Sequence, residues 1–254
     1  MPVTFGQPIQ RIQRLSAQCV AAGTTASAEL PGSLCEEAKK LVTDTVTFGS
    51  FPEQSEVFGK PFPLVLTPAA GASGSFVQLQ EYFLGHHAQI LKCASMYGAM
   101  YFKGFEICSP EEWASVVYAS GLKEMEYVGG AAVRKLIVGT EGNLTNPQIL
   151  TTNESPPSEP IPFHHELAQT PNPPTHISFY CSVNAAEGGS TPILRSDLVY
   201  DWLHQRHLPV LEKFEKLGVR YIRIVPEEDD PSSALGRSWK SMFKVSTVEE
   251  AEAA

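Results

Sequence analysis

The segment from Asn153 to Ser196 constrains this chain most, because it places an imidazole and a carboxylate two residues apart. His164 and Glu166 form a His-x-Glu pair that lies between proline-containing motifs and an apolar run. In an extended segment, residues i and i+2 point to the same side. The two side chains would therefore converge on one point. That is two-thirds of the 2-His-1-carboxylate triad that holds non-haem Fe(II) with coordination positions open.

A strand and a turn are predicted after this pair. Ile177–Cys181 alternates, with Ile177, Phe179 and Cys181 on one face, and Gly188-Gly189 then allows a sharp turn. The turn would bring Thr191 back near the pair. His-x-Glu alone arises often by chance, and the alternative is a surface turn with polar groups. The neighbouring prolines, strand and turn favour a site at the mouth of a sheet.

Composition indicates a globular protein. The chain has 254 residues, 43% hydrophobic and 19% charged, which suffices for one large domain or a domain with an appendage. The net charge of -9 argues against a general nucleic-acid partner, which needs a basic surface. The five scattered cysteines favour reduced thiols in an intracellular protein over a disulfide framework or zinc site. No apolar run reaches the roughly 20 residues that a membrane span needs.

The first 45 residues differ from the rest of the chain. Arg11 and Arg14 lie among Ser and Thr with no acidic residue before Ala28, which faintly resembles an organelle transit peptide. The favoured alternative is an unstructured extension. We therefore expect a cytoplasmic location, with a plastid or mitochondrion as the other candidate.

Periodicity and capping residues predict the regular elements. Apolar spacing predicts a helix that begins after Ser75, and Ser109, Pro110 and Glu112 mark the start of a second that ends at Gly121. His86-His87 lies in the first helix and is interpreted as structural. The other predicted elements are helices at 197–205 and 209–217 and strands at 64–66, 98–105, 134–138, 177–181 and 219–225.

Several short motifs of this sequence, which occur in the order typical of the family, resemble the TauD/TfdA family of dioxygenases, in its clavaminate synthase-like, plant-type branch. The resemblance covers about Pro61 to Phe243. The motifs that carry it are Tyr127-Val128-Gly129-Gly130-Ala131-Ala132, Asn153-Glu154-Ser155-Pro156-Pro157, Pro162-Phe163-His164-His165-Glu166, Phe179-Tyr180-Cys181, Gly188-Gly189-Ser190-Thr191-Pro192-Ile193 and Gly236-Arg237-Ser238-Trp239-Lys240.

The resemblance implies a fold and a division of the chain. The fold would be mainly β with flanking helices, a distorted double-stranded β-helix (jelly roll) that is incomplete at the C-terminus. Residues 1–45 would form a variable N-terminal extension, 46–245 a partial dioxygenase domain, and 246–254 a tail.

The resemblance also implies roles for individual residues. His164 and Glu166 would bind Fe(II) and be catalytic, while Thr191 would contact the co-substrate 2-oxoglutarate. Asn153 and Glu154 would line the substrate pocket. Iron with open positions could bind a 2-oxo acid and O2 and oxidise a small-molecule substrate. His165 would support the site or be structural.

The sequence departs from the family pattern after this site. The family's distal His ligand and the Arg that pairs with 2-oxoglutarate are not found, because His176, His204 and His207 lack the expected context. We therefore expect a C-terminally truncated member, from a partial gene model or a splice form. The alternatives are a non-catalytic jelly-roll binding module and, more weakly, a cupin-type metal protein. No feature predicts the substrate or the oligomeric state.

Overall fold

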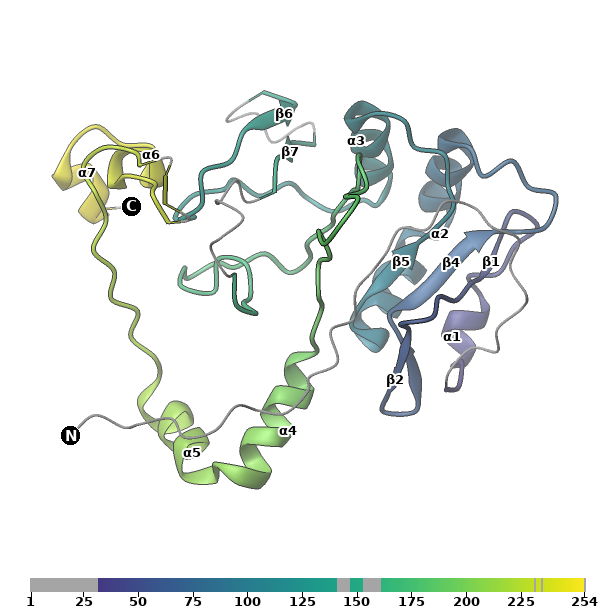
Figure 1. The fold of residues 1–254 in the computed structure, drawn as a ribbon, viewed down its shortest axis with the longest axis horizontal. Coiled ribbons are helices and arrows are strands. Elements are labelled where there is room, and N and C mark those ends of the chain that lie inside the picture. The colour runs from purple at the N-terminus through teal and green to yellow at the C-terminus, as the bar shows by residue number, and fades with distance from the viewer. Residues whose placement is uncertain (1–31, 141–146, 153–160, 231, 234, 254) are drawn as a thin grey trace.

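The computed structural model describes residues 32–140, 147–152, 161–230, 232–233 and 235–253, and its sheets are small (Figure 1). The largest has the strand order β1-β4-β5, and the other two are the pairs β2-β3 and β6-β7. The strands are β1 Val46–Phe48, β2 Ser55–Val57, β3 Lys60–Phe62, β4 Leu64–Pro68, β5 Met100–Phe102, β6 Leu136–Val138 and β7 Ile149–Leu150. β4 pairs antiparallel with β1 and parallel with β5.

Three helices pack with the central sheet to form the main hydrophobic core, at the right of Figure 1. They are α1 Glu36–Lys39, α2 Phe76–Tyr97 and α3 Pro110–Ala119. The fully buried side chains include Leu64, Leu66 and Leu79. Ala38 and Leu41 belong to the same core, so it reaches back to α1. The expected division at residue 45 stays a prediction, and residues 1–31 lie outside the described part.

The predicted starts of α2 and α3 are confirmed. The Ser75 hydroxyl accepts a hydrogen bond from the Gln78 backbone at the start of α2. Ser109 does the same for Glu112 at the start of α3, with Pro110 in the first helical position. Glu112 turns back to accept from the backbone N–H of Cys108 at 2.6 Å. These contacts satisfy donors that every helix start leaves unpaired.

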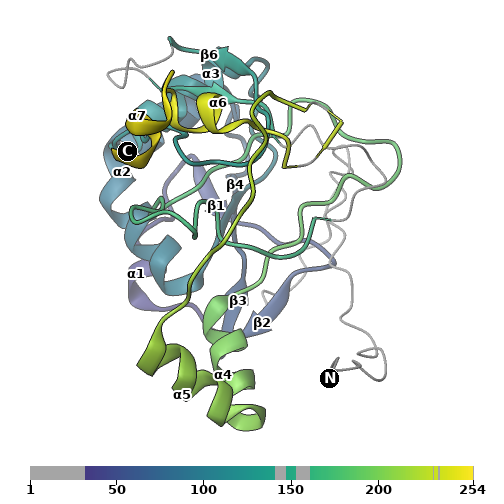
Figure 2. The ribbon, with the colours of Figure 1, turned by 90° about the vertical axis from the view of Figure 1, so that its left-hand side faces the viewer.

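The C-terminal helices form two separate pairs. They are α4 Ser196–Arg206, α5 Leu208–Leu217, α6 Trp239–Phe243 and α7 Val248–Ala253. α5 ends at Gly218, which has a φ of 72° as the C-terminal turn requires. In both views the α4–α5 pair lies well apart from the α6–α7 pair (Figures 1 and 2). Long extended segments connect them to the rest of the chain.

Two predicted strands are wrong. Residues 177–181 and 219–225 carry no strand assignment, and Ile177, Phe179 and Ile222 are exposed. A strand exists only when a neighbouring strand takes up its backbone hydrogen bonds, and neither segment has one in the described part of the chain. Helical residues accordingly outnumber strand residues among the described elements. Sheets with flanking helices are present, but within these residues they do not form a double-stranded β-helix.

Within the described ranges, no helix combines the length and the apolarity that crossing a bilayer would need.

Candidate functional site

The His-x-Glu pair lies in an irregular segment that begins at Ile161, after a gap in the described residues. His164 Nε2 and Glu166 Oε2 are 3.7 Å apart. That distance is too long for a direct hydrogen bond, so the two atoms face each other across a gap. The His164 side chain is 55% exposed and that of Glu166 is 18% exposed. The side chains at i and i+2 therefore converge as predicted, although no strand forms here.

A backbone contact determines which nitrogen of His164 is available. Nδ1 lies 2.8 Å from the carbonyl oxygen of Pro162. A carbonyl can only accept, so Nδ1 carries the proton in this hydrogen bond. The neutral imidazole then has its lone pair on Nε2, the atom that faces Glu166. A backbone carbonyl that fixes the tautomer in this way is common behind metal-binding histidines.

The carboxylate of Glu166 is held on its other side by Arg134. Arg134 Nη2 lies 3.1 Å from Glu166 Oε1, and the two side chains are only 16% and 18% exposed. Leu167, the next residue, is buried and adopts a positive φ of 53°, which non-glycine residues rarely do. Its carbonyl accepts from both the backbone and the hydroxyl of Thr170. The turn that follows Glu166 is thus tied down.

The pair fits a metal ion as two donors of the required types. Two bonds of about 2.1 Å at a right angle would place their donors about 3 Å apart, and a wider angle separates them further. The observed 3.7 Å between Nε2 and Oε2 lies within that range. Within the described residues no group of three His, Cys, Asp or Glu side chains could hold a metal. These residues therefore supply two ligands.

The roles of the other predicted site residues stay predictions. Thr191 is exposed, and the structure records no hydrogen bond between it and His164 or Glu166 among the described residues. Gly188 and Gly189 both have positive φ, as the predicted turn requires. Asn153 and Glu154 lie outside the described residues.

His165 links this segment to α4. Its Nε2 hydrogen-bonds with the hydroxyl of Ser196 at 2.6 Å, at the first residue of that helix. It therefore points to a partner other than the Glu166 carboxylate, in agreement with the supporting or structural role that the sequence suggested.

The later histidines are occupied elsewhere. His176 Nδ1 contacts the hydroxyl of Thr175. His204 stacks on Tyr200, and the ring of His207 lies 5.0 Å from that of Trp202. Among the described residues, none of these three histidines forms a cluster with His164 and Glu166.

The residues that sequence analysis missed gather around Tyr127. The guanidinium carbon of Arg134 lies 4.7 Å from the centroid of the Tyr127 ring, and that of Arg237 lies 5.5 Å from it. Arg237 also donates to the carbonyls of Tyr127 and Gly130. The motifs at 127–132, 162–166 and 236–240 are therefore joined in space, through the contacts of Arg134 and Tyr127. A partly buried Glu needs a cation nearby. Arg134, which follows the motif at 127–132, is the cation in the sequence that could have been predicted to pair with Glu166.

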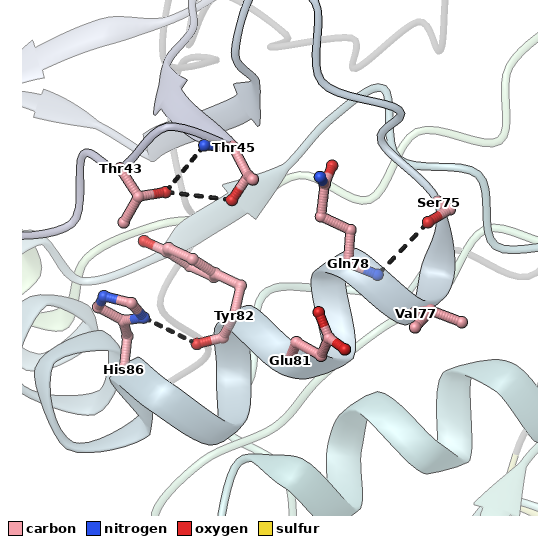
Figure 3. Close-up of a pocket in the computed structure, with 8 residues that line it drawn as sticks. All are labelled: Thr43, Thr45, Ser75, Val77, Gln78, Glu81, Tyr82 and His86. Carbon is pink, nitrogen blue, oxygen red and sulfur yellow. Dashed lines mark hydrogen bonds between the residues drawn. The ribbon is translucent and has the colours of Figure 1, made fainter.

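A pocket of about 370 Å³ lies elsewhere, at the start of α2 (Figure 3). The residues that line it are Thr43, Thr45, Ser75, Val77, Gln78, Glu81, Tyr82 and His86. Many of their polar atoms are engaged locally: the Thr43 hydroxyl accepts from the Thr45 backbone, and His86 Nδ1 bonds to the Tyr82 carbonyl. Neither His164 nor Glu166 lines this pocket, so we place the candidate site at the pair.

Comparisons with known proteins agree with the site residues in pointing to oxygenases. The profile of the taurine catabolism dioxygenase TauD, TfdA family matches residues 64–242. A clavaminate synthase-like protein of Arabidopsis thaliana is 38% identical over 200 residues, which are 76% of this chain and 57% of that protein. The dapdiamide synthesis protein DdaC of Enterobacter agglomerans is 27% identical over 196 residues, which are 77% of this chain and 53% of that protein. The chain thus spans somewhat over half the length of these relatives.

Proposed function

Because the chain belongs to the TauD, TfdA family of dioxygenases, we propose that it acts in a non-haem Fe(II)- and 2-oxoglutarate-dependent oxygenase that oxidises a small molecule. The observation that supports this most directly is the facing pair of His164 Nε2 and Glu166 Oε2 at 3.7 Å. The hydrogen bond from His164 Nδ1 to Pro162 supports it further, since it leaves Nε2 free to bind a metal.

Each site residue has a proposed role. His164 and Glu166 bind the iron, Thr191 contacts 2-oxoglutarate, and Asn153 and Glu154 face the substrate. Bound iron would supply the activation of O2 with 2-oxoglutarate as the reductant. The chain's own residues orient the donors: Pro162 sets the tautomer of His164, and Arg134 holds the carboxylate of Glu166.

The proposed function carries a proposal for the fold. The double-stranded β-helix of the family would surround this site. We further propose a cytoplasmic location, with a plastid or mitochondrion as the alternative.

A metal titration tests the site. Anaerobic addition of Fe(II) and 2-oxoglutarate should produce the visible charge-transfer absorption of the chelated iron. His164→Ala should weaken metal binding by more than about 100-fold, because even loss of a residue that only supports a ligand costs 10–100-fold. His176→Ala is the matched control, since this exposed imidazole contacts only the adjacent Thr175 hydroxyl among the described residues. Equal binding by wild type and His164→Ala would refute the assignment.

One observation favours a second candidate, a non-catalytic jelly-roll binding module. The described residues hold two donors and no group of three. Two protein ligands bind a metal more weakly than three, so the described residues alone would bind iron weakly. The module predicts that saturating Fe(II) leaves the melting temperature unchanged and that no succinate forms from 2-oxoglutarate. A rise in melting temperature with metal in wild type, absent in His164→Ala, would favour the oxygenase.

A further inference from the structure

We propose that Arg134 is the positioning residue of the metal site: it holds one oxygen of Glu166 so that only the other faces His164. The proposal rests on the proposed function, because it takes His164 and Glu166 as metal ligands. The two oxygens of Glu166 are in fact divided between two neighbours. Oε1 lies 3.1 Å from Arg134 Nη2, and Oε2 lies 3.7 Å from His164 Nε2.

The ion pair is sheltered from water. Arg134 and Glu166 are 16% and 18% exposed, so their attraction is screened less than that of a surface pair. Arg134 also reaches the carbonyl of Thr151 through Nη1, at 3.4 Å. The Arg134 guanidinium therefore connects the segment that carries Glu166 to Thr151, directly after β7. Because the guanidinium is anchored in this way, it can restrain the position of the Glu166 carboxylate as well as neutralise its charge.

The orientation of the guanidinium is itself set by Tyr127. The ring lies 4.7 Å from the guanidinium carbon of Arg134, a favourable cation–π distance. Gly130 helps to place this ring, because a Cβ at that residue would come within 2.1 Å of it. Arg237 then fixes the backbone by donating to the carbonyl of Tyr127 at 3.3 Å. The Tyr127 ring therefore supports Arg134, and the hydrogen bond from Arg237 fixes the backbone that carries this ring.

This arrangement determines how Glu166 can bind a metal. A carboxylate can ligate through one oxygen or through both. With Oε1 bound by Arg134, Glu166 offers Oε2 alone, so it fills one coordination position. A freed carboxylate could turn or chelate with both oxygens and so fill a position that a bidentate co-substrate needs. Arg134 thus keeps the coordination sphere open.

Co(II) binding to the full chain tests this inference without a catalytic assay. Arg134→Met removes the donors but keeps most of the side-chain length, and we expect it to weaken Co(II) affinity about 10–100-fold. The visible bands of the Co(II) that still binds should change in intensity, because they report coordination number and Glu166 can now use both oxygens. Arg134→Lys keeps a cation within reach and should retain more of the affinity.

Arg195→Met is the matched control. Arg195 is also mostly buried, pairs with Asp197, and lies over the ring of Phe58, but it does not contact Glu166. Its loss should leave Co(II) affinity and spectrum unchanged. Far-UV circular dichroism of each metal-free variant verifies the fold. If Arg134→Met does not fold, Tyr127→Leu replaces it, which keeps the charge and removes the supporting ring, and the same direction of change is expected.

The possible outcomes separate the two proposals. If wild type binds Co(II) in a manner that His164→Ala abolishes, but Arg134→Met binds equally well or more tightly with the same spectrum, the positioning role is overturned and the metal site stands. If wild type shows no binding that His164→Ala reduces, the metal site and the positioning role both fail. Weaker binding with an altered spectrum, partly restored by Arg134→Lys, supports the inference.

Discussion

At the scale of single residues, hydrogen bonds decide which side-chain atoms are left for chemistry. His164 commits Nδ1 to a carbonyl and Glu166 commits Oε1 to Arg134. The remaining atoms, Nε2 and Oε2, are the two that face each other. A similar commitment occurs in the core region, where Glu37 accepts from Gln89 at 2.8 Å and pairs with Lys40 and Lys92.

These donors should make stability depend on pH at Glu37. The hydrogen bond from Gln89, followed by those from Lys40 and Lys92, lowers the pKa of Glu37 from 4.5 to about 2. A carboxyl with a depressed folded-state pKa stabilises the fold above its unfolded pKa, and that contribution disappears as the pH falls through the folded value. Glu37→Gln should therefore lower the melting temperature at pH 7 and lose its effect between about pH 4.5 and 2.

Thermal melts of wild type and Glu37→Gln across this pH range provide the measurement. Glu36→Gln is the control, because Glu36 is 82% exposed and pairs only with Lys39 among the described residues. Its effect on the melting temperature should be small, as for most surface ion pairs. A difference for Glu37→Gln that stayed constant from pH 7 to pH 2 would contradict the expectation.

At the scale of elements, helix starts obey local rules and strands do not. The starts of α2 and α3 follow from Ser75 and Ser109, whose capping partners lie three residues further on, and from Pro110 in the first helical position. Strand residues need partners that the chain brings from a distance. Residues 219–225 have the composition of a strand but no strand beside them in the described structure.

The N-cap of α3 gives a test at this scale. Ser109→Ala removes the acceptor for the Glu112 backbone N–H and should lower the free energy of unfolding by about 0.5–2 kcal/mol. Urea denaturation measures it. Ser115→Ala is the control inside the same helix, where the hydroxyl only donates to the carbonyl of Glu111. Its change should stay within about 0.5 kcal/mol. Equal losses in the two variants would show that the cap is not special.

At the scale of the whole molecule, the core and the candidate site belong to different parts. The core gathers α1, α2, α3 and the central sheet, while the site segment and the residues after it are mostly exposed. Ile222 and Ile224 are 85% and 96% exposed, on a segment that has no strand partner in the described part of the chain. Exposed apolar side chains beside free backbone groups favour association between chains.

Self-association is therefore expected in solution. Replacing Ile222 and Ile224 together by Thr removes apolar area from the segment while keeping β-branched side chains. Sedimentation velocity should show a larger monomer fraction for this double variant than for wild type at the same concentration. Val183→Thr, at a residue that is 83% exposed outside the segment, is the control and should change little. An unchanged distribution in the double variant would exclude residues 219–225 as the cause.

The local sequence alone determined the starts of α2 and α3 and the facing of His164 and Glu166. Both depend on neighbours within a few residues, through capping and through the direction of alternate side chains. The family motifs likewise indicated the family that the profile match shows. The roles of Thr191, Asn153 and Glu154 stay predictions.

Only the tertiary structure decided that Arg134 holds Glu166 and that Tyr127 supports Arg134. Thirty-two positions separate Arg134 from Glu166, and 110 separate Arg237 from Tyr127. No periodicity or spacing rule connects residues so far apart, because the chain path between them determines which charges meet. The same reason explains the two wrong strands: their pattern was local, but a strand forms only through hydrogen bonds to another segment.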